Sequence, residues 1–131
     1  MHDKKVLHRD LKPLNIFITS SGLVKLGDFG ISRVLSNTLS RATTKIGTMA
    51  FCSPEWIEDE AYGFKSDIWS LGVTLYYMAA LKLPFEGKPM AFMMAIAAGK
   101  YSPVPSHVSK NVRNLIEMML QTEPDKRPTV E

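Results

Sequence analysis

His-Arg-Asp-Leu-Lys-Pro-Leu-Asn, residues 8–15, is the stretch that decides the fold of this 131-residue sequence. It lies between two short β-type runs, residues 6–7 and 16–19, so it is predicted to form a loop at the ends of strands. A second short motif, Asp-Phe-Gly, begins thirteen residues after Asn15, at Asp28. Loops held by a rigid scaffold often carry functional side chains, so these two motifs form the candidate functional site.

A hairpin and a long loop are expected around these motifs. The β-type runs at residues 16–19 and 23–26 are separated by Ser-Ser-Gly, residues 20–22, which predicts a tight hairpin connection. Together with residues 6–7, these runs predict a small β-rich platform. From residue 31 to residue 46 the sequence is rich in Ser, Thr, Asn and basic residues and has little periodicity, which predicts a long loop.

The rest of the chain is predicted to be helical. Ser66 is expected to cap a helix that runs to about Leu81. Apolar residues wrap most of the circumference of this helix, which predicts that it is buried; they are Ile68, Trp69, Leu71, Val73, Leu75, Tyr76 and Met78. A second helix is expected over residues 88–98, before Gly99, since glycine suits the left-handed position after a helix.

A third helix is predicted to begin after Ser109 and to be stopped by Pro124. Its apolar residues fall on one helical face; they are Val112, Leu115, Ile116, Met119 and Leu120. A small β platform followed by helices predicts an α+β fold.

Composition excludes several other classes of protein. With 45% apolar and 22% charged residues, the chain is expected to fold around a core rather than to be disordered. Sixteen Lys and Arg against 13 Asp and Glu give a net charge of +3, spread along the chain, which predicts neither nucleic-acid nor membrane binding. The single cysteine, Cys52, and the lack of a basic-then-apolar leader favour a reducing, intracellular and cytoplasmic location.

Taken together, the motifs resemble the signature set of protein kinases. Besides the two loops, the sequence has Ser-Pro-Glu at residues 53–55, where most kinases have Ala-Pro-Glu. It also has Asp-Ile-Trp-Ser-Leu-Gly from Asp67 and Arg-Pro-Thr from Arg127. This resemblance covers nearly the whole chain. It implies a protein-kinase-like fold, with a mainly helical C-terminal lobe and the small β platform at the cleft.

The resemblance also implies ATP and Mg²⁺ as cofactors and a protein as substrate. Asp10 is then expected to accept or orient the proton of the substrate hydroxyl. Lys12 is expected to place a positive charge on the transferring phosphate, and in the family a Lys at this position accompanies Ser/Thr substrates. Asn15 and Asp28 are expected to bind Mg²⁺ and, through it, the nucleotide, because they supply hard oxygen ligands.

These residue types suit the chemistry. Phosphoryl transfer needs the negative charge of the nucleotide held and a hydroxyl aimed in line, and it needs little covalent chemistry from the protein. Taken singly, Asp10 and Asp28 are most simply interpreted as solvated carboxylates in turns. Their joint spacing with Lys12 and Asn15 favours the catalytic interpretation.

The histidine and the aromatic residues near these motifs are interpreted differently. A lone His beside apolar residues is most often a packed, hydrogen-bonded core residue. In the family the matching His packs on the Phe of the second motif, so His8 and Phe29 are expected to form an internal stack. Phe17 matches a position that touches the adenine ring in relatives, but a strand Phe is equally well a core residue, and both interpretations stay open.

Residues 28–55 look like a kinase activation segment. The resemblance implies that Glu55 and Arg127 form a buried ion pair that anchors the end of this segment, and that Asp67 belongs to a buried helix. Removing one partner of such a pair typically costs about 3–5 kcal/mol, because a charge is left stranded.

Within the kinases, the sequence looks most like the NIMA-related (NEK) group. The features that carry this likeness are Gly27 before the second motif, Ile-Ser-Arg at residues 31–33, and Ser-Pro-Glu at residues 53–55. Thr48 belongs to the part of the segment that points to protein substrates.

Thr44 matches an activating phosphorylation site in several relatives. A phosphate there is expected to lie within reach of Arg9 and Arg33 and to order the loop through charge-assisted hydrogen bonds. The alternative is that Thr44 is only a soluble spacer in a loop, and both interpretations stay open.

We therefore expect residues 1–131 to be a partial protein kinase domain, with a catalytic loop at 8–15, an activation segment at 28–55 and a helical subdomain at 56–131. No Gly-rich loop or strand Lys precedes the first motif, so the N-terminal lobe is expected to be absent and the chain to be a fragment. The alternative function is a non-catalytic lobe that binds a protein. An activating kinase, or a partner that covers the exposed face of the lobe, is a further expected partner.

Overall fold

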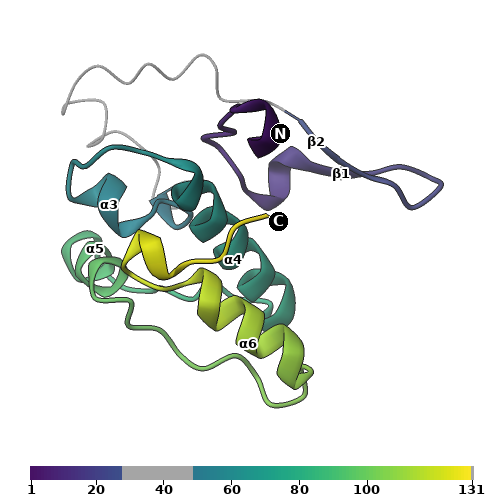
Figure 1. The fold of residues 1–131 in the computed structure, drawn as a ribbon. Coiled ribbons are helices and arrows are strands. Elements are labelled where there is room, and N and C mark those ends of the chain that lie inside the picture. Colours follow the sequence, from purple (N-terminus) through teal and green to yellow (C-terminus); the bar gives the residue numbers. More distant parts are fainter. Residues whose placement is uncertain (28–48, 131) are drawn as a thin grey trace.

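The computed structural model describes residues 1–27 and 49–130, and the expected loop at 31–46 lies outside them. In the described part of the chain the elements are the 3-10 helices η1 (His2–Lys4), η2 (Pro13–Asn15) and η3 (Pro124–Lys126), the strands β1 (Ile16–Ile18) and β2 (Val24–Leu26), and the helices α3 (Pro54–Ile57), α4 (Phe64–Ala80), α5 (Pro89–Ala97) and α6 (Lys110–Met119). Figure 1 shows the hairpin projecting away from the helical part. The predicted α+β class is confirmed.

Strands β1 and β2 form the predicted hairpin. They pair antiparallel, with Ile16 opposite Leu26 and Ile18 opposite Val24. The turn uses Gly22 at a positive φ of 81°, which glycine adopts without a steric penalty. The expected strand at residues 6–7 was wrong: these residues are not in the sheet, which has two strands in the described part of the chain. A strand needs a neighbouring strand for its backbone N–H and C=O groups, and among the described residues the two strands of the sheet pair only with each other.

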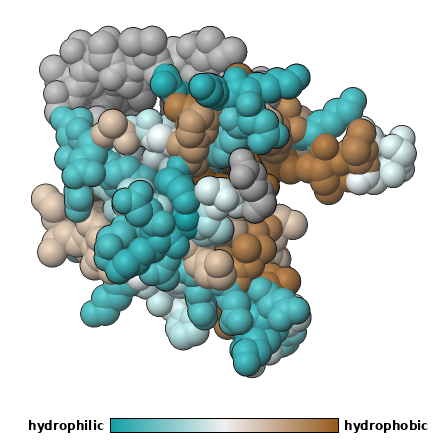
Figure 2. All heavy atoms as spheres, in the orientation of Figure 1, coloured by the Kyte–Doolittle hydropathy of each residue, from teal (hydrophilic) through white to brown (hydrophobic). Residues whose placement is uncertain are grey.

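The hairpin exposes apolar side chains. Phe17, Ile18, Leu23 and Val24 are all at least half exposed. Figure 2 shows a largely hydrophobic projection where the hairpin leaves the rest of the molecule. A two-stranded hairpin is marginally stable by itself, so its stability depends on the segments that join it to the rest of the molecule.

Helix α4 is the centre of the helical part, as predicted, but Ser66 is not its N-cap. The cap is Gly63, and Ser66 is the third residue of the helix. Its hydroxyl accepts a hydrogen bond from the Gly63 N–H at 3.0 Å, so it satisfies the cap from inside the helix. At the other end Leu81 adopts a left-handed conformation, with φ at 55°, and ends the helix where the sequence predicted.

The apolar circumference of α4 is buried on one side only. Trp69, Val73 and Tyr76 are fully buried, whereas Met78 is 64% exposed. Gly72 allows close packing of α4 against α6, because a Cβ there would lie 2.8 Å from Cβ of Met119. The predicted burial of the whole helix was therefore wrong for its C-terminal outer face, where Tyr77, Met78 and Leu81 are exposed.

Helices α5 and α6 begin and end close to their predicted limits. Gly99 follows α5 with φ at 59°, the left-handed conformation expected. The Ser109 hydroxyl caps α6 by accepting the Val112 N–H at 3.4 Å. Helix α6 ends at Met119, before Pro124, which opens η3 instead. On its predicted apolar face, Ile116, Met119 and Leu120 are buried, but Val112 and Leu115 are about two-fifths exposed.

Helix α3 was not predicted as an element. It is a single turn that begins with Pro54, whose fixed φ suits the first helical position. It places the carboxylate of Glu55 in the interior. Among the described residues, none of the helices is both long enough and apolar enough to span a bilayer.

Candidate active site

The loop at residues 8–15, called the 8–15 loop below, brings three predicted side chains together around one carboxylate. The Lys12 ammonium donates to both carboxylate oxygens of Asp10, at 3.1 Å to Oδ1 and 2.9 Å to Oδ2. The Asn15 amide nitrogen donates to Oδ2 at 3.1 Å and to the Asp10 backbone carbonyl at 2.8 Å. Pro13 starts the turn η2, which returns the chain so that Asn15 faces Asp10.

The orientation of Asn15 suits a hard metal ion. Among the described residues, Asn15 makes two side-chain hydrogen bonds, both donated by its NH₂ group, and no donor reaches its Oδ1. This oxygen therefore keeps its lone pairs for a cation such as Mg²⁺, the ion that the resemblance implies. The other expected ligand, Asp28, lies outside the described residues. Within residues 1–27 and 49–130, no group of three His, Cys, Asp or Glu side chains is arranged to hold a metal.

His8 connects the 8–15 loop to the end of the hairpin. Its ring is fully buried, and Nε2 lies 3.0 Å from the carbonyl oxygen of Gly27, the last described residue before Asp28. A carbonyl only accepts, so Nε2 carries the hydrogen, which leaves Nδ1 to accept the Asp10 N–H at 3.4 Å. The burial fits the packed role expected of His8, although its expected partner Phe29 lies outside the described residues.

Asp67 holds the 8–15 loop to α4. Its carboxylate is fully buried and lies near the start of the helix. The backbone N–H of His8 donates to Oδ2 at 2.8 Å, and the backbone N–H of Arg9 donates to Oδ1 at 3.0 Å. One carboxylate from a distant helix therefore fixes two successive amides just before Asp10.

Two further donors to Asp67 were missed at the sequence level. The His2 ring nitrogen Nε2 lies 3.0 Å from Oδ2, and the Tyr62 hydroxyl donates to Oδ1 at 2.6 Å. His2 is 65 residues from Asp67, so no local pattern signals its contact. Tyr62 is five residues from Asp67, but it lies before the helix begins, where helical spacing rules do not apply.

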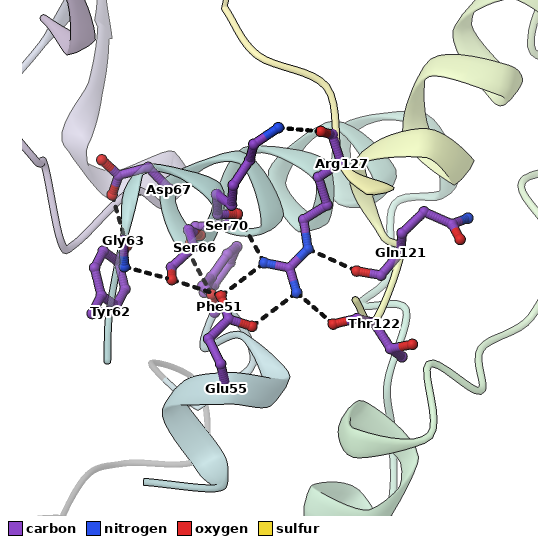
Figure 3. Close-up of polar contacts among 11 residues, drawn as sticks. Phe51, Glu55, Tyr62, Gly63, Ser66, Asp67, Ser70, Gln121, Thr122 and Arg127 are labelled. Carbon is purple, nitrogen blue, oxygen red and sulfur yellow. Dashed lines mark hydrogen bonds and ion pairs between the residues drawn. The ribbon is translucent and has the colours of Figure 1, made fainter. Parts of the chain in front are cut away.

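The expected pair of Glu55 and Arg127 is present and bidentate. Arg127 Nη1 and Nη2 each donate to one Glu55 oxygen at 2.8 Å (Figure 3). Both side chains are almost completely buried. The Ser66 hydroxyl donates to the same carboxylate, at 2.6 Å from Oε1. Burial alone would raise the pKa of Glu55, but the hydrogen bonds from Arg127 and Ser66 hold it below its ordinary value.

All five N–H groups of the Arg127 guanidinium have acceptors. Besides the two bonds to Glu55, they donate to the backbone carbonyls of Gln121 (2.7 Å), Lys65 (2.9 Å) and Thr122 (2.8 Å). The guanidinium also lies over the Trp69 ring, 5.0 Å from its centroid. Arg127 thus joins α3, α4 and the segment after α6, as Figure 3 shows.

Of the remaining predicted site residues, Phe17 and Arg9 lie among the described residues and the others do not. Phe17 is 51% exposed and lies against Gly27, where a Cβ would approach its ring to 2.6 Å, so Phe17 is not part of the buried core. Arg9 has an exposed side chain. The other predicted residues, Arg33, Thr44 and Thr48 together with Asp28 and Phe29, lie outside the described residues.

Comparison with known proteins places the whole chain in one family. Residues 1–131 match the family described as "Protein kinase domain". The chain is 46% identical over 131 residues to mouse (Mus musculus) serine/threonine-protein kinase Nek1, in an alignment that covers 99% of this chain and 11% of Nek1. It is 43% identical to human (Homo sapiens) Nek5, covering 99% of this chain and 19% of that protein. It is 47% identical to nekl-2 of Caenorhabditis elegans, covering 99% of this chain and 37% of that protein.

Proposed function

Because the chain belongs to the protein kinase family and is similar to Nek serine/threonine kinases along its length, we propose that it supplies the catalytic large-lobe part of such a kinase. The chain spans between 11% and 37% of the length of the three relatives named above. The proposed reaction transfers the γ-phosphoryl group of ATP to a Ser or Thr hydroxyl of a protein. Residues 8–15 serve as catalytic loop, 28–55 as activation segment and 56–131 as helical subdomain.

The observation that carries the proposal is the cluster of Asp10, Lys12 and Asn15. The carboxylate of Asp10 accepts the proton of the substrate hydroxyl, or orients that hydroxyl, as the oxygen attacks phosphorus. Lys12, which lies between 2.9 and 3.1 Å from the Asp10 oxygens, supplies positive charge beside the transferring group. Asn15 holds the Asp10 backbone with its NH₂ group and presents Oδ1 to Mg²⁺. When bound, ATP would supply the phosphoryl group and leave as ADP, and Mg²⁺ held by Asn15 and Asp28 would offset the negative charge of the phosphates.

The remaining site residues take supporting roles in this proposal. Asp28 is a second Mg²⁺ ligand. Phe17 contacts the adenine ring, an assignment that its half-exposed position on β1 supports. Phosphorylation of Thr44 by an activating kinase orders the activation segment through Arg9 and Arg33. Mass spectrometry of active protein from native cells is expected to find phosphate on Thr44, and consistently unmodified Thr44 in active protein would remove this part of the proposal.

Asp10→Asn in the protein expressed at its natural full length tests the catalytic assignment. We expect kcat for peptide phosphorylation to fall at least about 100-fold, because the amide does not accept the proton. The matched control is Asp3→Asn, an exposed carboxylate in η1, which should leave the rate unchanged. Phosphorylation at the normal rate by Asp10→Asn would show that Asp10 has no such role.

A second candidate function is a non-catalytic lobe that binds a protein partner. The observation that favours it is the exposed apolar end of α4, where Tyr77, Met78 and Leu81 are uncovered. Titration calorimetry with ATP and Mg²⁺ separates the two functions. A folded full-length protein that gives no heat with ATP and Mg²⁺ would favour the binding function, and saturable heat would favour catalysis.

A further inference from the structure

The carboxylate of Asp67 has a regular set of donors. Each of its oxygens accepts one backbone N–H from the 8–15 loop and one side-chain donor: His8 and His2 at Oδ2, Arg9 and Tyr62 at Oδ1. Two side-chain donors therefore join two backbone donors in setting which way the carboxylate faces when it holds the loop. Figure 3 shows the Tyr62 side chain directed toward Asp67 from the segment before α4.

The Arg9 amide, which shares Oδ1 with Tyr62, belongs to a residue with unusual backbone geometry. Arg9 has φ at 67°, a left-handed conformation that a residue with a Cβ adopts only at a cost. Such a conformation persists where surrounding contacts hold it. Here the contact is the 3.0 Å hydrogen bond from the Arg9 N–H to Asp67, and the next residue in the chain is Asp10.

We propose that Tyr62 is a positioning residue for the kinase reaction proposed above, on which this inference rests. Its hydroxyl, 2.6 Å from Oδ1 of Asp67, fixes the carboxylate so that Arg9 keeps its left-handed backbone and Asp10 keeps its aim at the substrate hydroxyl. Tyr62 touches neither substrate nor nucleotide in this proposal and acts only through Asp67.

The environment of Tyr62 keeps its hydroxyl protonated, so that it can donate a hydrogen bond to Asp67 at all working pH values. Burial, and next the negative charge of Asp67, raise the pKa of Tyr62 far above its ordinary value. The hydroxyl therefore keeps its hydrogen throughout the pH range in which proteins work, and its bond to Asp67 does not titrate away.

Tyr62→Phe in the full-length protein is the direct test, since it removes one oxygen and keeps the ring. We expect kcat to fall on the order of tenfold while KM for ATP and KM for peptide stay within about twofold, because binding surfaces are unchanged and the alignment of Asp10 is loosened. We also expect amide hydrogen exchange at residues 8 and 9 to become faster, on the order of tenfold, relative to the core of α4.

The matched control is Tyr76→Phe. Tyr76 also loses a buried phenol hydrogen bond, to the Ser102 carbonyl at 3.0 Å, but it lies in α4 away from the 8–15 loop. A merely structural effect would lower kcat equally in the two variants, and that result would overturn the proposal. Replacing Tyr62 by para-aminophenylalanine, which restores a donor at the same place, should recover both kcat and slow exchange; it also provides the test if Tyr62→Phe does not fold.

Failure of this inference is distinguishable from failure of the proposed function. If the wild-type protein has no kinase activity, amide exchange at residues 8 and 9 still reports whether Tyr62 holds the loop. If the wild-type protein is active and Tyr62→Phe keeps normal kcat and normal exchange, Tyr62 has no positioning role.

Discussion

The carboxylates of Glu55 and Asp67 are both buried, and each joins segments that are far apart in the sequence, but they are satisfied in different ways. Glu55 is paired with a guanidinium whose five N–H groups are all used, so it fastens α3 to the segment after α6. The Asp67 carboxylate accepts hydrogen bonds from two backbone amides, a phenol and an imidazole, so it holds the conformation of the 8–15 loop. The first arrangement fixes packing between elements, whereas the second fixes backbone geometry beside Asp10.

Breaking the Glu55 arrangement should have the largest effect on stability. Arg127→Met leaves the Glu55 carboxylate buried without its cation, and we expect the free energy of unfolding to fall by about 3–5 kcal/mol. Denaturant unfolding measures this change. Lys126→Met is the control, since it removes an exposed ion pair with Glu123 and should cost no more than about 0.5 kcal/mol. Similar losses of unfolding free energy in the two variants would contradict the interpretation that the buried pair of Arg127 and Glu55 stabilises the fold.

Breaking the Asp67 arrangement should have a smaller effect on stability and a local effect on the loop. Asp67→Asn replaces one acceptor oxygen by an NH₂ group and removes the charge, so we expect a loss of about 2 kcal/mol. Amide exchange at residues 8 and 9 should become faster than in Arg127→Met at matched stability. Asp125→Asn, at an exposed position in η3, is the control. Unchanged exchange at residues 8 and 9 would show that Asp67 does not hold the loop.

Acid sharpens the comparison, because the pKa of Glu55 is held below its ordinary value by Arg127 and Ser66 against the opposing effect of burial. The unfolded state therefore binds more protons than the folded state near the ordinary pKa of Glu. The stability from Glu55 is fully present above about pH 4.5 and is lost as the pH falls through the lower folded pKa. Tm measured against pH should fall less steeply in Glu55→Gln than in wild type over that acid range, and parallel curves would contradict this prediction.

The smallest effect on stability is expected at Ser53. Both Ser53 and Ser66 are buried; Ser53 lies two residues before Glu55 in the sequence, and Ser66 contacts Glu55 in space. Within the described structure the Ser53 hydroxyl has no hydrogen-bond partner, whereas the Ser66 hydroxyl serves Glu55 and Gly63. Ser53→Ala should therefore stabilise the fold, by no more than about 1 kcal/mol, and Ser66→Ala should destabilise it by about 1–2 kcal/mol. Thermal unfolding of the two variants measures the difference, and destabilisation by Ser53→Ala would show that its hydroxyl has a role.

The local part of the candidate site was predictable. Asp10, Lys12 and Asn15 lie within six residues of one another, and Pro13 at the start of a turn brings the chain back between them, so spacing along the chain is enough to predict that their side chains meet. The helix limits near Gly99 and Ser109 were also predictable, since caps act through neighbouring residues. The pairing of Glu55 with Arg127 was expected only from the resemblance to kinases.

Three predictions from the sequence were wrong for a common reason. Ser66 has the chemistry of an N-cap, but the helix begins before it, and its hydroxyl is used by both Gly63 and Glu55. Residues 6–7 have a β-type composition, but neither of the two strands in the described part of the chain pairs with them. The outer face of α4 near Met78 has apolar side chains that the described residues leave exposed. In each case the propensity is a property of the residue itself, whereas the observed structure depends on what lies beside that residue in space.

By itself, the sequence therefore predicted the grouping of Asp10, Lys12 and Asn15 in one loop, the hairpin and the three longer helices, because turns and helix caps between near neighbours depend on spacing along the chain. Only the tertiary structure decided what holds that chemistry in place: the donors of Asp67 come from residues 2, 8, 9 and 62. Which donors meet one buried carboxylate depends on how α4 packs against the 8–15 loop. That packing is a property of the whole folded chain. Because burial keeps water away from the carboxylate, its hydrogen bonds have to come from protein donors that the fold brings to it.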